Sequence, residues 1–243
     1  MESGVALVTG SSSGIGAAIA RRLAADGLRV VIHSRRSRDT GHELARELGG
    51  VYLQANLSDD EQAQMLVGRC VEECGRLDVL VNNAGLSRPI PHHDLAAASP
   101  EVWREILQVN LLAPWIVTTA AAEYLQASSH PGGGCIVNIT SHAGIRPKGS
   151  SIPYAASKAA LNHTTRLLAR TLAPAVRANA IAPGLVDTPM TADWAEAQAL
   201  WRQNSPMRRA AAPADAADIA SAIVSSRYLT GEVIMLDGGL NLT

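Results

Sequence analysis

The sequence predicts an α/β fold, in which a single doubly wound domain is built on a central parallel sheet of about seven strands flanked by helices. The first observation is a series of short, mostly β-branched apolar runs, at 5–8, 30–32, 51–53, 79–81, 135–139, 176–182 and 232–236. The second is a helical period near 15–27, 39–48, 59–74, 99–126 and 153–173. Runs that are apolar on both faces and alternate with helices are typical of buried parallel strands.

The elements follow one another without a linker, a repeat or a low-complexity block. The first strand leads through a glycine-rich turn directly into the first helix. The helix near 99–126 has a clear start signal, because Ser99 suits the N-cap, Pro100 the first helical position and Glu101 the first turn. The glycines at 132–134 are too few to separate domains and stand where a turn leads into a strand. We therefore expect one domain over residues 1–243, although this length would also suit two small ones.

Charge and hydropathy exclude several classes of protein. The net charge is −1, and the chain is 47% hydrophobic and 18% charged, which is typical of a globular protein. The only basic run is Arg35-Arg36 with Arg38, so no nucleic-acid partner is expected. No signal-peptide pattern precedes the first strand, and no uncharged apolar run reaches the roughly 18 residues of a membrane span. We expect a cytoplasmic protein without a membrane partner.

Cysteine and histidine usage indicates no metal site. The three cysteines are an odd number, and Cys70 and Cys74 stand four residues apart in a helical segment. Buried thiols in a reducing compartment explain this pattern better than a disulfide or a zinc site. The seven histidines include no HExxH spacing. We predict no bound metal.

A glycine-rich turn follows the first strand and predicts a phosphate-binding loop. Gly10, Gly14 and Gly16 allow the backbone to turn sharply and to approach a ligand closely. The amides and the dipole of the following helix then favour a pyrophosphate. The GxxxxGK[ST] pattern of a P-loop kinase is absent. A generic glycine-rich turn is the alternative interpretation.

The end of the second strand indicates which dinucleotide this loop would bind. An NAD-preferring site places an acidic residue there, but no carboxylate occurs between Asp26 and Asp39. Arg35 and Arg36 occupy the position instead, and a guanidinium pairs well with a 2′-phosphate. The sequence therefore predicts NADP(H) as the preferred cofactor, with NAD(H) still possible. The alternative is that the two arginines merely solvate the strand end.

A tyrosine and a lysine indicate the chemistry. Only two lysines, Lys148 and Lys158, occur among the 21 basic residues, and Lys158 stands four residues after Tyr154 on one helix face. A tyrosine pKa of about 10 is too high for an efficient base at neutral pH. A nearby ammonium, helped by an oxidised nicotinamide, stabilises the phenolate and lowers that pKa. It also offers rotatable donors to a ribose. We interpret Lys158 as the residue that activates Tyr154, rather than as a solvated lysine.

Two further polar residues stand at positions that suit catalysis. Ser141 follows the strand 135–139, so its hydroxyl is expected at the carboxyl end of the sheet, where it would donate to a substrate carbonyl. Its alternative role is to cap a turn. Asn110 lies within an otherwise apolar helix, where a buried amide needs partners, and a backbone-satisfied core Asn is the alternative there.

In their order and spacing these motifs resemble the short-chain dehydrogenases/reductases, over residues 5 to 240. The motifs are Thr9-Gly10, Gly14-Ile15-Gly16, Asn82 to Gly85, Asn110, Ser141, Tyr154 with Lys158, and Pro183-Gly184. The resemblance implies a Rossmann-type, NADP-preferring oxidoreductase that moves a hydride between the nicotinamide and a secondary alcohol/ketone carbon. It implies that Tyr154 is the acid/base, Ser141 polarises the carbonyl and Asn110 holds a water that relays protons from Lys158.

The resemblance also implies the cofactor-binding residues. They are Gly10, Ser12, Ser13, Gly14, Ile15, Gly16, Ser34, Arg35, Arg36, Asn56, Leu57, Asn83, Ala84, Gly85, Tyr154, Lys158, Pro183, Gly184, Val186 and Thr188. Asn56 stands where the family commonly has an Asp that contacts adenine. Val186, through its backbone, and Thr188, through its hydroxyl, are expected to meet the carboxamide.

Among family members the pattern is most similar to 3-oxoacyl-(acyl carrier protein) reductases, which implies a 3-oxoacyl thioester or a small ketone as substrate. The similar stretches are 205–208, 228–232 and 237–239. The segment 124–130 lacks the basic residues that meet an acidic carrier, and the segment 218–228 is shorter than usual, so carrier docking and assembly are open. Helices 99–126 and 153–173 are rich in small and apolar residues, as in relatives that form tetramers. A homo-oligomer, tetramer or dimer, is expected.

The expected substrate loop spans about 187–212. Its large apolar residues are Met190, Trp194, Leu200, Trp201 and Met207. They would suit either a lid over an apolar pocket or a helix packed on its own core. His142, beside Ser141, would face either substrate or solvent. Two other functions remain compatible with the sequence: a non-redox epimerase or dehydratase that uses its cofactor transiently, and a redox-sensing NADP-binding protein.

Overall fold

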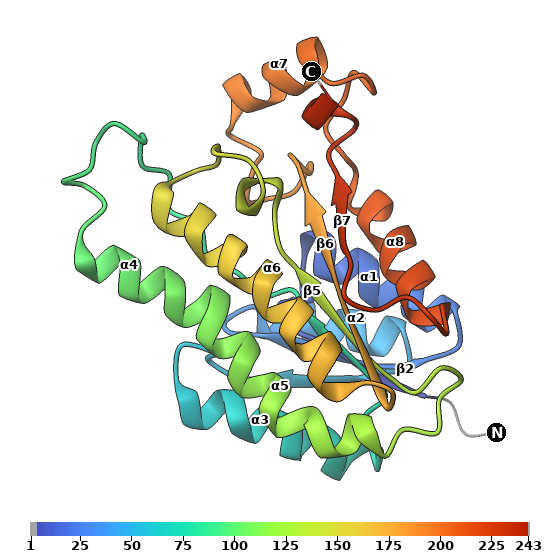
Figure 1. The fold of residues 1–243 in the computed structure, drawn as a ribbon. Coiled ribbons are helices and arrows are strands. Elements are labelled where there is room, and N and C mark those ends of the chain that lie inside the picture. Colours follow the sequence, from blue (N-terminus) through green and yellow to red (C-terminus); the bar gives the residue numbers. More distant parts are fainter. Residues whose placement is uncertain (1–3, 243) are drawn as a thin grey trace.

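The predicted strands form one parallel sheet in the computed structural model, which describes residues 4–242 (Figure 1). The strands are β1 (Val5–Val8), β2 (Arg29–Ser34), β3 (Val51–Gln54), β4 (Val79–Asn82), β5 (Gly134–Ile139), β6 (Val176–Pro183) and β7 (Val233–Leu236). Their order is β3-β2-β1-β4-β5-β6-β7, and every pairing is parallel. The order reverses between β1 and β4, and such a switch point is where open α/β sheets bind ligands. The predicted fold class is confirmed.

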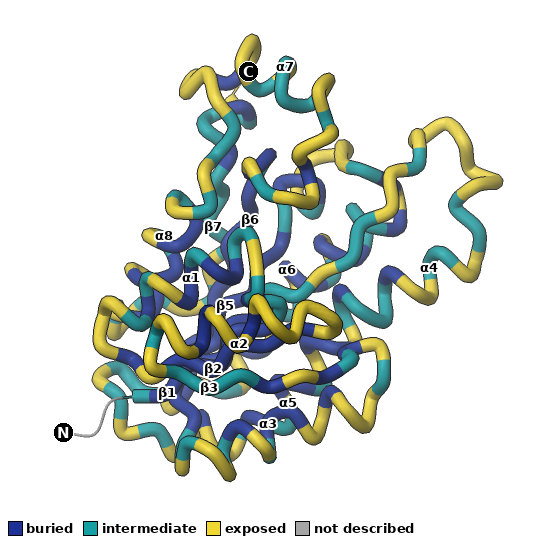
Figure 2. Tube along the Cα trace, turned by 180° about the vertical axis from the view of Figure 1, so that it is seen from behind, coloured by how far each residue is buried: buried dark blue, intermediate teal, exposed yellow. Residues whose placement is uncertain are grey.

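Helices cover both faces of the sheet (Figure 1). They are α1 (Gly14–Ala25), α2 (Arg38–Glu47), α3 (Asp60–Cys74), α4 (Pro100–Leu107), α5 (Ala113–Gln126), α6 (Ile152–Leu172), α7 (Ala195–Asn204) and α8 (Pro213–Ser225). Side chains from α1, α2 and α8 pack on one face, and side chains from α3, α5 and α6 on the other. In Figure 2 the strands are mostly dark blue, whereas the outer sides of the helices are largely yellow. The central strands are therefore apolar on both faces, as the sequence predicts.

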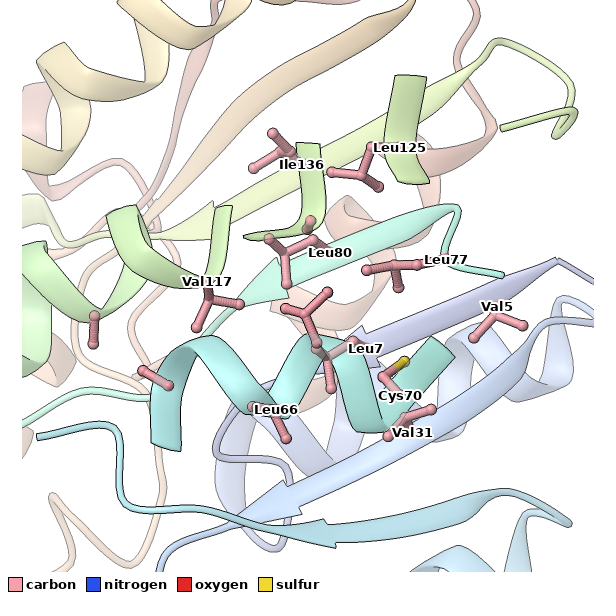
Figure 3. Packing of buried hydrophobic residues seen from close by; sticks show 14 of the residues in the cluster. Val5, Leu7, Val31, Leu66, Cys70, Leu77, Leu80, Val117, Leu125 and Ile136 are labelled. Atoms are coloured by element: carbon pink, nitrogen blue, oxygen red, sulfur yellow. The ribbon is translucent and has the colours of Figure 1, made fainter. Parts of the chain in front are cut away.

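The register of the sheet sorts neighbouring side chains between the two cores. Leu7, Leu80 and Ile136 are aligned across β1, β4 and β5, and all three belong to the core under α3 and α5 (Figure 3). Val81 and Val137, one position further along, belong to the opposite core. This alternation follows from the pleat of a β-strand. The parallel register places the carboxyl ends of the strands at a common edge, where the loops that carry polar residues begin.

The predicted helix over 99–126 is interrupted. A π-helical turn at Gln108–Leu112 separates α4 from α5. Such turns are rare and occur frequently at functional sites, and this one contains Asn110. By length and composition alone, Pro100–Gln126 passes the test for a membrane span. In the structure, however, α4 and α5 lie against α6 and α3 within the helical layer.

The segment 218–228 is short because α8 ends at Ser225 and the chain returns at once toward β7. A buried arginine on β6, Arg177, occupies the space beyond the helix end. Its guanidinium donates to the carbonyls of Ile223, Val224, Leu229 and Gly132, at 2.8, 3.1, 3.3 and 3.1 Å. Two of these are among the last carbonyls of α8, which a positive charge stabilises. Arg177 therefore acts as a C-terminal cap supplied by a strand.

Candidate active site

A cavity of about 740 Å³ lies along the carboxyl ends of the strands. Nineteen of the expected cofactor-binding residues line it: Gly10, Ser12, Ser13, Gly14, Ile15, Ser34, Arg35, Arg36, Asn56, Leu57, Asn83, Ala84, Gly85, Tyr154, Lys158, Pro183, Gly184, Val186 and Thr188. They come from the loops after β1, β2, β3, β4 and β6 and from α6. The topology therefore brings together residues that are up to 178 positions apart in the chain (188 − 10).

The loop after β1 has the properties of a phosphate site. Gly10 and Gly14 adopt positive φ values of 64° and 55°, which glycine tolerates best. The N-cap residue of α1, Ser13, makes no side-chain hydrogen bond to the helix, and no acid stands in the first turn. The first amides of α1 therefore remain available to an anion, and the helix dipole favours one. The residues present fit a dinucleotide pyrophosphate.

Gly16 differs from its two neighbours because it does not line the cavity. A Cβ there would lie 2.4 Å from Nδ2 of Asn83 and 2.6 Å from the carbonyl oxygen of Gly10. The Asn83 side chain occupies this space and donates to the carbonyls of Thr9 and Gly10 at 2.8 and 3.0 Å. Gly16 is thus needed for close packing of the loop, and its predicted contact with the cofactor stays a prediction.

Thr9 fastens the loop after β4 to the loop after β1. Its Oγ1 accepts hydrogen bonds from the amides of Asn83 and Ala84 at 3.0 and 3.1 Å and donates to the Val81 carbonyl at 3.2 Å. Thr9 and Asn83 together hold the two loops at the switch point. The sequence motif around Thr9 and the later Asn82–Gly85 motif are therefore two halves of one structural unit.

Arg35 and Arg36 lie at the other end of the cavity, after β2, and both are exposed. Neither makes an ion pair with a carboxylate of residues 4–242, so both guanidinium groups are available to an anionic ligand. Asn56 lines the same end, and its Oδ1 accepts from the amide of Ser58 at 3.2 Å. An adenosine with a 2′-phosphate would meet a positive surface here.

Ser141, Tyr154 and Lys158 all line the cavity, and the side chains of Ser141 and Tyr154 are hydrogen-bonded to each other. Ser141 directly follows the loop residue after β5, and its Oγ accepts from the amide of Ala143 at 3.1 Å, so it also caps the short turn that the alternative interpretation required. Nζ of Lys158 donates to the carbonyl of Ile139 at 2.9 Å and lies 5.9 Å from the ring centroid of Tyr154. The three side chains expected from the sequence are therefore adjacent.

Burial shifts the pKa values of Tyr154 and Lys158. Desolvation by the surrounding protein raises the pKa of Tyr154, and its hydrogen bond with Ser141 opposes that rise. Burial lowers the pKa of Lys158 to about 8. The lowering of the tyrosine pKa that the sequence predicts also depends on an oxidised nicotinamide, so it stays a prediction. Charge supplied by a bound cofactor would have to make up the difference.

Asn110 is buried beside this group and does not line the cavity. Its Oδ1 accepts from the amide of Leu86 at 2.7 Å, and its Nδ2 donates to the Leu86 carbonyl at 2.9 Å and to Oγ of Ser157 at 3.1 Å. A Cβ on Gly85 would lie 3.5 Å from Oδ1 of Asn110 and 3.6 Å from Nζ of Lys158. Asn110 therefore positions the loop after β4 next to Lys158, and its part in a proton relay stays a prediction.

The substrate end of the cavity is lined by α7 and the loop before it. Met190, Trp194, Leu200 and Trp201 of the expected substrate loop contribute, whereas Met207 packs against Gly238 instead. No residue of α7 is fully buried, and α7 lies beyond the carboxyl end of β6, apart from the two main cores (Figure 1). This arrangement favours a lid over a helix with a core of its own.

His142 lies at this end and is buried. Its ring meets Trp201 edge to face with centroids 6.1 Å apart, and its Nε2 lies 3.6 Å from Oδ2 of Asp237. Burial lowers the pKa of His142, and the carboxylate of Asp237 opposes that shift. Of the two environments left open by the sequence, the structure places His142 at the cavity.

Sequence reasoning missed several lining residues, among them His33, Leu86, Thr140 and Lys148. The sequence offered one signal for Lys148, because it is one of only two lysines in the chain. The structure shows that both lysines line the same cavity. His33 carried no comparable signal. A histidine inside an apolar strand is more often a satisfied core residue than a site residue.

The chain is similar to known proteins over nearly its whole length. Residues 10–241 match a family model described as enoyl-(acyl carrier protein) reductase. A ketoacyl reductase named for the granaticin polyketide synthase of Streptomyces violaceoruber is 51% identical over 245 residues, which are 99% of this chain and 97% of that protein. The 3-oxoacyl-[acyl-carrier-protein] reductase of Thermotoga maritima is 35% identical, over 99% of this chain and 98% of its own.

A solved structure of similar fold contains a bound nucleotide. The short chain dehydrogenase from Burkholderia cenocepacia, crystallised in complex with NADP, has a TM-score of 0.88 and 36% identity, covering 97% of each chain. Fold, site and relatives thus define an enzyme that acts on CH–OH and C=O groups. The chain belongs to the short-chain dehydrogenases/reductases, which confirms the resemblance seen in its motifs.

Proposed function

We propose that the protein is an NADP-preferring ketoreductase that reduces a ketone carbon of a 3-oxoacyl or polyketide-type thioester to a secondary alcohol. The observation that carries the proposal is the adjacency of Ser141, Tyr154 and Lys158 in a cavity that a glycine-rich loop and two unpaired arginines also line. The relatives named as ketoacyl and 3-oxoacyl reductases support the substrate class.

Each side chain has a distinct part in this proposal. Ser141 donates to the substrate carbonyl oxygen, where negative charge develops. Tyr154, the general acid for reduction, gives its proton to the same oxygen. Lys158 is held by the Ile139 carbonyl beside the tyrosine ring, where its ammonium favours the phenolate that remains. Asn110 fixes the loop that borders Lys158.

The cofactor would be held by the loop after β1 and by the ends of β2 and β3. The uncapped amides of α1 suit its pyrophosphate, and Arg35 and Arg36 suit a 2′-phosphate. The NADP complex of the Burkholderia cenocepacia relative supports this preference. When bound, NADPH supplies the hydride, while the side chains of this chain orient the substrate and move the proton.

The loop over residues 187–212 would act as the substrate lid. Trp194, Leu200 and Trp201 give the substrate end an apolar lining, as an acyl or polyketide chain requires. We also propose a cytoplasmic homo-oligomer, a tetramer or a dimer. Leu112 and Trp115, at the start of α5, are 46% and 48% exposed, and large exposed apolar side chains of this kind mark association surfaces.

The test is the oxidation of NADPH, followed by absorbance, with a panel of ketones and 3-oxoacyl thioesters. We expect activity in the wild type, a loss of several hundredfold or more in Tyr154→Phe, since positioned acid–base groups contribute about 10²–10⁴-fold, and no loss in Tyr228→Phe. Tyr228 is 96% exposed and serves as the matched control. The carbonyl panel also ranks the thioesters against simple ketones.

The cofactor preference is tested separately. Arg35→Ser should raise KM for NADPH and leave KM for NADH nearly unchanged, because only NADPH carries the 2′-phosphate. A wild-type enzyme that prefers NADH would contradict the preference. Product formed without net NADPH consumption would indicate an epimerase or dehydratase instead, and nucleotide binding with no turnover of any carbonyl would indicate a redox sensor.

A further inference from the structure

His33 joins two walls of the cavity through its ring. It stands near the end of β2, is 2% exposed and lines the cavity. Its Nδ1 accepts a hydrogen bond from the amide of Gly10 at 3.0 Å, and its Nε2 lies 3.1 Å from the carbonyl oxygen of Ala55. A carbonyl only accepts and a peptide amide only donates, so the proton resides on Nε2 and Nδ1 carries a lone pair. The two contacts fix one neutral tautomer.

The backbone of His33 is tied to the same loop. Ser11 donates its amide to the His33 carbonyl at 2.9 Å, and the His33 amide donates to Oγ of Ser11 at 2.9 Å. That hydroxyl in turn donates to the Val8 carbonyl at 2.7 Å. The entry of the glycine-rich loop is therefore held against β2 by both main chain and side chain. Ala55 directly precedes Asn56 and Leu57, which line the adenosine end.

We propose that His33 is a positioning residue for the dinucleotide, because its neutral ring holds the glycine-rich loop and the Ala55–Leu57 wall at a fixed separation. The inference rests on the proposed function only in that the ligand is NADP. It concerns binding and requires no turnover. Both ring nitrogens of His33 already make hydrogen bonds within the protein. His33 therefore acts through Gly10 and Ala55 rather than as a catalytic residue.

The surroundings of the ring make this link sensitive to acid. A second proton would go to Nδ1 and remove its bond with the Gly10 amide. Burial lowers the pKa of His33 to about 4, the Ala55 carbonyl opposes that shift, and the guanidinium of Arg69 on α3 adds to it. Arg35 and Arg36 at the end of β2 are also cationic, and α1 has no acid in its first turn. The folded protein thus keeps the ring neutral down to about pH 4, whereas a histidine in the unfolded chain takes up a proton below about pH 6.5. Acid between these pH values therefore destabilises the folded loop.

Three substitutions separate the two ring contacts. His33→Asn retains an acceptor near the position of Nδ1 and loses the reach to Ala55, whereas His33→Gln retains a donor near Nε2 and loses the bond to Gly10. His33→Leu removes both. Ile32→Val, at a fully buried neighbour on the same strand, is the control for a small loss of core packing. The probe is oxidised NADP, titrated by calorimetry or fluorescence, with thermal unfolding recorded for every variant.

We expect His33→Leu to bind NADP about tenfold or more weakly than wild type, and His33→Asn to bind more tightly than His33→Leu, since one part-buried hydrogen bond corresponds to about five- to tenfold. In turnover assays, His33→Leu should raise KM for NADPH by a larger factor than it lowers kcat. Between pH 6.5 and about 4, the free energy of unfolding of the wild type should fall more steeply than that of His33→Asn, because the unfolded histidine takes up a proton that the buried ring does not.

Wild-type NADP affinity in a folded His33→Leu variant would overturn the inference. An equal loss of unfolding free energy between pH 6.5 and about 4 in wild type and His33→Asn would overturn it as well. If His33→Leu fails to fold, the comparison of the Asn and Gln variants decides, because only the former retains the Gly10 contact. Absence of carbonyl turnover would count against the proposed function while leaving these binding results unaffected.

Discussion

Gly16→Ala is the substitution for which the structure gives the clearest expected magnitude. Both Gly16 and Gly68 lie in helices, α1 and α3, where alanine is intrinsically favoured by about 0.5–1 kcal/mol. A Cβ on Gly68 meets nothing within 4 Å. A Cβ on Gly16 would lie 2.6 Å from the Gly10 carbonyl oxygen and 2.9 Å from Cα of Ser11, which are backbone atoms that cannot rotate away. The same chemical change therefore has opposite consequences at the two sites.

The expected cost at Gly16 is the sum of three effects. Overpacking costs about 1–3 kcal/mol. Displacing the Asn83 side chain breaks its bonds to Thr9 and Gly10, at about 1 kcal/mol each. Helix propensity returns up to about 1 kcal/mol. We expect Gly16→Ala to lower the free energy of unfolding by about 2–4 kcal/mol, which shifts Tm down by roughly 5–15 °C for a chain of this size.

Urea and thermal unfolding of both variants, with NADP titration, form the assay. Gly68→Ala should raise the free energy of unfolding by about 0.5–1 kcal/mol and leave NADP affinity unchanged. Gly16→Ala should weaken NADP binding at least tenfold, since the loop must move. A Gly16→Ala protein that is as stable as wild type, or one that keeps wild-type NADP affinity, would refute the assigned packing role of Gly16.

Two other predictions concern buried cations. Arg177→Met should lower the free energy of unfolding by about 3 kcal/mol, because it removes the hydrogen bonds to four carbonyls, of which only that of Leu229 keeps another side-chain donor, Asn179. Urea unfolding checks this, and a loss below about 1 kcal/mol would contradict the capping role. Lys158→Met should abolish turnover yet raise the free energy of unfolding at pH 7 by roughly 2 kcal/mol. This gain is the energy no longer spent on burying the ammonium, minus the energy of the lost hydrogen bond to the Ile139 carbonyl. The pKa of Lys158 is about 8 in the folded protein and 10.5 ordinarily, so between these pH values the unfolded chain binds more protons than the folded protein. The gain in stability should therefore fade as pH rises from 8 to 10.5. A gain that is independent of pH, or a destabilised variant, would contradict this.

The sequence alone determined the α/β fold and the order of its elements, and it singled out the side chains that we propose as catalytic, because these depend on local patterns. Apolar runs, helical periods and glycines at turns are legible over a few residues. The spacing of Tyr154 and Lys158 along one helix made their adjacency predictable. The helical break at 108–112 was not predictable in this way, since Asn110 is held there by Leu86 and Ser157, which lie 24 and 47 residues away.

Only the tertiary structure decided the roles that depend on distant contacts. The pattern of glycines did not show that Gly16 packs against the Asn83 side chain. Nothing in the sequence around His33 showed that its ring bridges Gly10 and Ala55. The assembled fold also desolvates the Tyr154 hydroxyl, which raises its pKa in the protein alone, whereas the lowering predicted from the sequence depends on an oxidised nicotinamide as well. Desolvation and close packing are properties of the assembled fold, so no stretch of sequence contains them.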